Sequence, residues 1–110
     1  MSWWLVNFSR GAQARYLSHL DTARLVQRMF ARAGVPIALS QGMRPKPRLS
    51  LPLPLPVGAA GVDELATVEV PKGVVVTTEV LRALRRSGPP GVDVIGIIDV
   101  LIAALMGQFI

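Results

Sequence analysis

The stretch SHLDTARLVQRMFARAG, residues 18–34, carries the strongest structural signal in the chain. Ser18 followed by Asp21 is typical of a helix start, where a hydroxyl and an acidic residue three positions later meet free backbone amides. Gly34, shortly before Pro36, supplies the stop. Apolar residues recur at helical spacing between these signals and predict an amphipathic helix. Its apolar stripe is expected to comprise Leu20, Ala23, Val26, Phe30 and Ala33, widened by Leu25 and Met29.

Extended segments and a second helix flank this helix along the chain. Residues 3–9 and 65–70 alternate between two faces, as strands with one buried face do. A threonine-capped helix is predicted over about 77–87, where a Gly/Pro run ends it, and a last strand begins near Val92. With a further extended segment at 48–55, the order is strand, helix, strand, strand, helix, strand. This order predicts an α+β fold, a ferredoxin-like βαββαβ sandwich.

The loop between the first helix and the next strand combines stiffness with positive charge. It reads SQGMRPKPR, and Pro45 and Pro47 lower the entropy that its three basic side chains would lose on binding a ligand. Gly42 lets the backbone approach a phosphate or adopt a positive φ. The loop therefore favours a clamp for a polyanion, although a basic surface loop stiffened by prolines stays open as the alternative.

The leucine and proline alternation after this loop restricts the strand that it forms. Leu49, Leu51, Leu53 and Leu55 share one face, while prolines at two intervening positions remove backbone donors. A central strand cannot tolerate such gaps in its hydrogen bonding. The segment is expected to be an edge strand or a polyproline-like ribbon.

The net charge of +5 is unevenly distributed over the 110 residues. Residues 1–50 carry eight Lys and Arg against one Asp, a balance of +7, and residues 51–110 carry four against six acids, a balance of −2. Seven of those eight cations are arginine, whose planar fork matches phosphate oxygens. Arg24, Arg28 and Arg32 recur every fourth residue on the first helix. The basic half is the candidate contact surface, with a merely solvated basic face as the alternative.

Several classes of chemistry are not supported by the sequence. The absence of cysteine excludes disulfides, thiolate zinc sites and iron–sulfur clusters, and His19 is the only histidine. No GxGxxG, Walker or GxSxG motif is present. Asp21 is explained by its place in the helix first turn, whereas His19 could contact a ligand beside the basic loop. We expect no catalytic residue, metal site or cofactor, and a protein that is not an enzyme.

The length of 110 residues predicts one domain, residues 1–110, and the N-terminus favours a cytoplasmic protein. The N-terminus lacks the pattern of a signal peptide. The apolar tail at 93–110 is interrupted by Asp99, and the eleven residues after it are too few to span a bilayer, which needs ~20. We expect the tail to be buried against an oligomer partner or a missing downstream segment. Trp3 and Tyr16 are candidates for stacking on bases, with core or edge packing as the alternative.

Four segments together are similar to a known family: RYLSHLD at 15–21, ARAGVPIALSQGMRPKPRLSLPLPLPVG at 31–58, EL at 64–65 and PPGV at 89–92. They resemble the radical SAM-linked family, also called DUF2344, over about residues 6–92. Three features depart from its pattern: Met43 stands where an aromatic residue is usual, Gly61 where a serine is common, and the chain ends where family domains usually continue.

Members of this family occur alone or joined to a B12-binding radical SAM protein, in a genomic context of RNA processing and ribosomal proteins. The resemblance therefore implies an accessory or RNA-related role and no reaction. We expect a non-catalytic RNA-binding or ribosome-associated module, with an interaction module for a radical SAM enzyme, or a subunit of an RNA-modifying enzyme using His19, as alternatives. The candidate binding residues are Arg15, His19, Arg24, Arg28, Gln41, Gly42, Arg44, Lys46 and Arg48.

Overall fold

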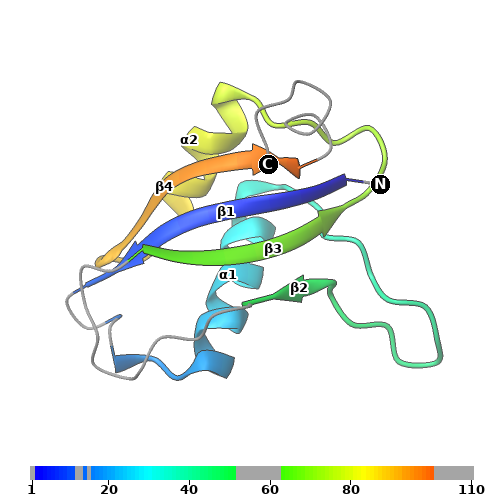
Figure 1. Cartoon of the computed structure of the whole chain (residues 1–110), viewed down its shortest axis with the longest axis horizontal. Helices are drawn as coiled ribbons and strands as arrows, with labels where there is room; N and C mark the ends of the chain where they lie inside the picture. Colours follow the sequence, from blue (N-terminus) through cyan, green and yellow to red (C-terminus); the bar gives the residue numbers. More distant parts are fainter. Residues whose placement is uncertain (1, 12–13, 15, 52–62, 101–110) are drawn as a thin grey trace.

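Two helices and four strands of the computed structural model follow one another in the order predicted from the sequence (Figure 1). The structure describes residues 2–11, 14, 16–51 and 63–100. The elements within these residues are β1 (Ser2–Arg10), α1 (His19–Ala33), β2 (Leu49–Ser50), β3 (Asp63–Val70), α2 (Thr78–Ser87) and β4 (Val92–Asp99).

The four strands form one antiparallel sheet in the order β2-β3-β1-β4. This order places the two strands that follow the helices, β2 and β4, at the edges, as a ferredoxin-like sandwich requires. The predicted fold class is therefore confirmed. The edge position of β2 is confirmed as well, while the Leu/Pro alternation from Pro52 to Leu55 lies outside the described residues.

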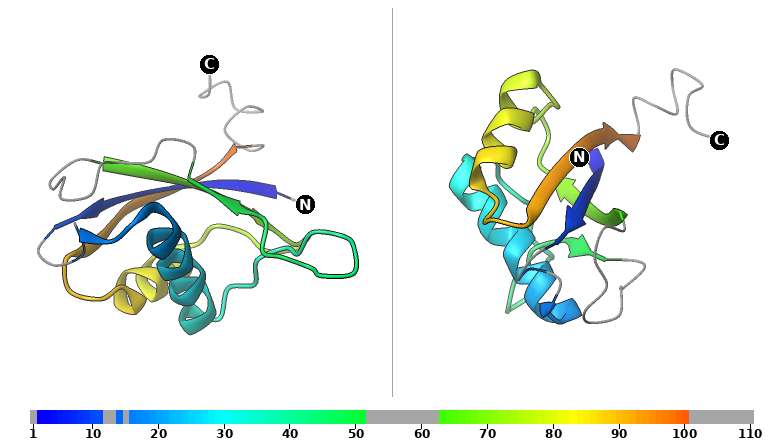
Figure 2. Two further views of the ribbon diagram at one scale, coloured as in Figure 1. Left: turned by 90° about the horizontal axis from the view of Figure 1, so that it is seen from below. Right: turned by 90° about the vertical axis from the view of Figure 1, so that its left-hand side faces the viewer.

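Both helices lie on the same face of the sheet, and no described helix covers the other face (Figure 2). Alternation along β1 directs Trp4, Val6 and Phe8 towards the helices, where all three are buried. The Trp4 ring packs against Phe30 of α1 with 6.2 Å between ring centroids. Facing positions of β3, such as Val68, complete the core beneath the helices. The buried core thus lies between the helix layer and one sheet face.

The predicted ends of α1 are confirmed at both caps. The Ser18 hydroxyl accepts a hydrogen bond from the Asp21 amide at 3.1 Å, so it satisfies one of the free donors of the first turn. At the other end Gly34 has φ of 74°, a left-handed conformation that glycine adopts without strain. The helix therefore starts and stops where its local signals place it.

The predicted apolar stripe of α1 is wrong in its first turn. Leu20 is 58% exposed, and Thr22 is fully buried instead. The buried face runs through Thr22, Val26 and Met29, and at 3.6 residues per turn Leu20 falls on the opposite side of the helix. Burial of Thr22 is possible because its hydroxyl donates to the Ser18 carbonyl at 2.8 Å.

The second helix also begins and ends as predicted. Its cap is Thr77, whose hydroxyl accepts from the Val80 amide at 3.1 Å, and the helix ends before Gly88. Arg85 then donates to the carbonyls of Val94 and Ile95 at 3.0 and 3.1 Å. These bonds anchor α2 to β4, so one arginine of α2 has a structural role.

The two described helices can be compared with a helix that crosses a membrane. Neither α1 nor α2 combines the length and the apolar character that a bilayer-crossing helix needs. The predicted apolar tail lies mostly outside the described residues, because they end at residue 100.

Candidate functional site

The loop that follows α1 is a closed hairpin-like projection. Its base is held by two hydrogen bonds: the Ser40 amide donates to the Lys46 carbonyl at 2.8 Å, and the Lys46 amide donates to the Ser40 hydroxyl at 3.0 Å. A bridge between Leu39 and Pro47 continues the pairing towards the sheet. The loop extends beyond the rest of the molecule in both figures (Figures 1 and 2). Its geometry is fixed at the base, which is what a pre-ordered binding loop requires.

The tip of this loop, residues 41–46, presents its side chains to solvent. Gln41, Met43, Arg44 and Lys46 are exposed. Gly42 has φ of 131°, which a residue with a side chain adopts only with strain, and so the predicted conformational role of this glycine is present. The loop therefore holds two cations and a large apolar side chain away from the protein body.

The arginine row of α1 is exposed along its length. Arg24 lies 3.9 Å from Asp21, at the outer limit of an ion pair, and both side chains are more than half exposed. Arg28 and Arg32 are exposed, and neither forms an ion pair with any side chain that the structure describes. The same holds for Arg44 and Lys46 of the loop. These four cations keep their charge available to an anionic ligand.

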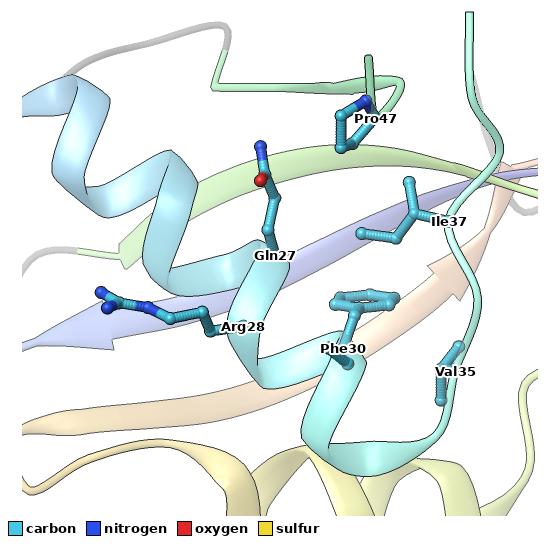
Figure 3. A pocket seen from close by; sticks show the side chains of 7 residues that line it. Gln27, Arg28, Phe30, Val35, Ile37 and Pro47 are labelled. Carbon is cyan, nitrogen blue, oxygen red and sulfur yellow. The ribbon is translucent and has the colours of Figure 1, made fainter. Parts of the chain in front are cut away.

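A surface hollow of about 360 Å³ joins α1 to the base of the loop (Figure 3). Phe30 forms its floor, Ile37 and Pro47 stand on one side, and Gln27 rises from α1 on the other. The remaining lining residues are Arg28, Ala31 and Val35. Arg28 and Pro47 therefore line the same hollow, but the Arg28 guanidinium points away from Pro47.

Arg48 does not join this surface. Its Nε forms a hydrogen-bonded ion pair with Glu69, and its guanidinium carbon lies 5.6 Å from the centre of the Trp3 ring. Trp3 and Glu69 are paired across β1 and β3 on the face that no described helix covers. Arg48 therefore points to the opposite side of the sheet from α1, although it is close to Lys46 in sequence.

The other predicted residues are scattered. His19 is exposed in the first turn of α1, which lies well away from the loop in both figures, so the histidine is not beside the basic loop (Figures 1 and 2). Arg15 lies outside the described residues. Tyr16 is exposed and Trp3 is 40% exposed. Of the predicted set, Gln41, Gly42, Arg44 and Lys46 lie together on the loop, and Arg28 lines the hollow at its base.

Within the described residues, no group of three or more His, Asp and Glu side chains is close enough to hold a metal ion.

Comparison with known proteins places the chain in a family. Residues 4–107 match the model of a family described as "Uncharacterized protein conserved in bacteria (DUF2344)". The chain belongs to the DUF2344 family. The match extends past residue 92, where the resemblance in the sequence was expected to end. Searches of curated proteins and of solved structures found no match.

Two features of this DUF2344 chain were missed by the sequence analysis. The hollow was not predicted, because Gln27 and Ile37 are ten residues apart and carry no motif. Arg10 was counted among the cations of the basic half, but it is buried and lies 2.7 Å from Glu64, with a further bond from its guanidinium to the Leu17 carbonyl. The alternation along the first strand could have indicated this burial, because Arg10 lies on the same face as the apolar Phe8.

Proposed function

We propose that this DUF2344 domain is an RNA-binding or ribosome-associated accessory module that contacts phosphates with its loop and with α1. The observation that carries the proposal is the set of exposed cations without an ion pair on α1 and on the closed loop: Arg28, Arg32, Arg44 and Lys46 among the described side chains. Arginine and lysine contacts to phosphates supply most of the sequence-independent affinity of nucleic-acid-binding proteins.

The construction of the loop supports this use. Because Ser40 and Lys46 close its base and two prolines lie within the segment 44–48, the basic side chains start from a restricted backbone. Restricting the free state lowers the entropy lost on binding. Each cation would then contribute a salt-sensitive phosphate contact at little ordering cost.

The proposal can be tested by fluorescence anisotropy with single-stranded and structured RNA over a series of salt concentrations. We expect the logarithm of the affinity to fall linearly with the logarithm of salt concentration, with a slope of about −0.7 per phosphate contact for a single strand. No binding at low salt, or an affinity indifferent to salt, would remove the proposal.

A charge-matched pair of double variants locates the surface. Arg44→Ala with Lys46→Ala should lower the affinity roughly tenfold at low salt and reduce the magnitude of the slope by about 1 to 2. Arg82→Ala with Arg86→Ala removes the same charge from exposed positions of α2, which lies away from the loop (Figures 1 and 2). Equal losses in the two double variants would show binding by net charge alone.

A second candidate function rests on the uncovered sheet face. Trp3, Leu65 and Ile98 are exposed there, on three neighbouring strands. Exposed apolar surface of this kind suits docking of a protein, and the family resemblance suggests a radical SAM enzyme as the partner. Co-purification with such an enzyme that Ile98→Lys abolishes, with RNA binding unchanged, would favour this function.

A further inference from the structure

The hollow beside the loop combines an apolar interior with one amide. Phe30 and Val35 are buried, while Ile37 and Pro47 form an opposite wall that is half buried. The Gln27 side chain stands across from Pro47, and Arg28 points away from the apolar wall (Figure 3). A volume of about 360 Å³ lies within the range of sites for small ligands.

We infer that this hollow receives one unpaired base of the bound RNA, and that adenine fits it best. The inference rests on the proposed RNA binding and adds the recognition of a single base. A base is planar and apolar on both faces, so it can lie between Phe30, Ile37 and Pro47. The Gln27 amide offers a donor and an acceptor side by side, the combination that pairs with the N6 and N7 atoms of adenine.

The charges around the hollow favour a nucleotide over an apolar peptide. Arg28 lines the hollow on the helix side, with its guanidinium directed outward, and Lys46 precedes the lining residue Pro47 in the loop. Both are exposed, and neither is paired with a carboxylate of the described residues. An occupant with an anionic group next to a flat apolar centre matches Arg28 at the edge of the hollow, and a nucleotide within a strand has a phosphate next to its base.

Filling the hollow without changing its charge is the direct test. Ala31 lines the hollow from an exposed helix position, so Ala31→Phe places a ring in the space that a base would occupy while α1 remains intact. Affinity for a single-stranded oligoadenylate should fall about tenfold, which is the contribution that stacking of one base makes to binding. Affinity for a fully paired RNA duplex of equal length should be unchanged. Thr78→Phe, at an exposed position of α2 away from the hollow, is the control.

A second variant tests whether Gln27 recognises adenine. Gln27→Leu keeps the size of the side chain and removes its donor and acceptor, and so the preference for oligoadenylate over oligouridylate should disappear while binding of both persists. The amide signals of Gln27 should shift in NMR spectra when oligoadenylate is added. Circular dichroism and thermal unfolding of each variant confirm that the fold is retained.

The outcomes separate this inference from the function on which it rests. If the wild-type domain binds no RNA, both the proposed function and the inference about the hollow are wrong. If the wild type binds RNA and Ala31→Phe binds as tightly, only the hollow is excluded as a base site. Adenosine monophosphate is the third arm: binding as tight as that of oligoadenylate would show that the hollow serves a free nucleotide, which overturns the inference, and weaker binding supports it.

Discussion

The two glutamates of β3 hold two arginines in different ways. Glu64 faces the helices, and it and Arg10 are almost completely buried with 2.7 Å between their charged groups. Glu69 is five residues further along, on the other face of the sheet, where it pairs with Arg48, whose side chain is 45% exposed. The odd spacing sends the two carboxylates to opposite faces because side chains alternate along a strand. Both partners of the first pair are buried, whereas in the second pair the buried carboxylate of Glu69 meets an arginine that is about half exposed.

The difference shows what a count of charges along a sequence can conceal. Arg10 and Arg48 both contribute to the balance of +7 in residues 1–50, and both are neutralised by acids from the second half of the chain. Arg10 is unavailable to any ligand, since its guanidinium also donates to the Leu17 carbonyl. Arg48 can still be recruited, because about half of its side chain reaches solvent. The available basic surface is thus smaller than the sequence suggests.

Breaking the buried pair should have the largest effect. Glu64→Gln leaves the Arg10 charge buried without a counter-charge, and we expect a loss of about 3–5 kcal/mol in the free energy of unfolding. Urea unfolding followed by tryptophan fluorescence measures it. A loss below ~1 kcal/mol would show that solvent reaches the pair.

A double variant separates charge from shape at the same place. Arg10→Met with Glu64→Leu removes both charges and should recover part of the lost stability, because no charge remains buried alone. The recovery should be incomplete, since the Leu17 carbonyl loses its donor. A double variant less stable than Glu64→Gln would contradict this account.

The next prediction compares the RNA binding of an unpaired arginine, Arg28, with that of a paired one, Arg48. Arg28→Ala should weaken binding of single-stranded RNA about threefold at low salt, because Arg28 is exposed and unpaired among the described residues. Arg48→Ala should weaken it less, because this arginine already has Glu69 as a partner. Anisotropy titrations at one low salt concentration measure both. A larger loss for Arg48→Ala would move the binding surface to the other sheet face.

The order of helices and strands could be predicted from the sequence because its signals are local. Ser18, Gly34 and Thr77 act on amides and carbonyls a few residues away, so their effect does not depend on the rest of the fold. The buried face of α1 was predicted less well, because the sequence does not specify from which side the sheet approaches. Leu20 has the composition of a core residue and the angular position of a surface residue.

The site could be predicted only in part, because it depends on contacts between distant segments. The sequence identified the stiff basic loop and the arginine row, and the structure brings Arg28 and Pro47 to one hollow. The sequence did not show that Arg48 points to the sheet face opposite α1, because this orientation follows from the strand register that places Glu69 opposite Trp3. Register is set by pairing across the sheet, which local patterns do not specify.

Releasing Arg48 gives the smallest expected effect. Glu69→Gln removes the negative charge and keeps the shape, and the free energy of unfolding should change by less than about 1 kcal/mol, because Arg48 is about half exposed and can be solvated when it loses the buried Glu69 carboxylate. RNA affinity should rise about twofold at low salt, because the negative charge beside Arg48 is removed and Arg48 regains freedom to bind phosphate. Glu79→Gln, which removes an equal charge from the exposed first turn of α2, is the control. If Glu79→Gln raises the affinity as much, net charge explains the gain; if only Glu69→Gln does so, Arg48 is a reserve contact that Glu69 restrains.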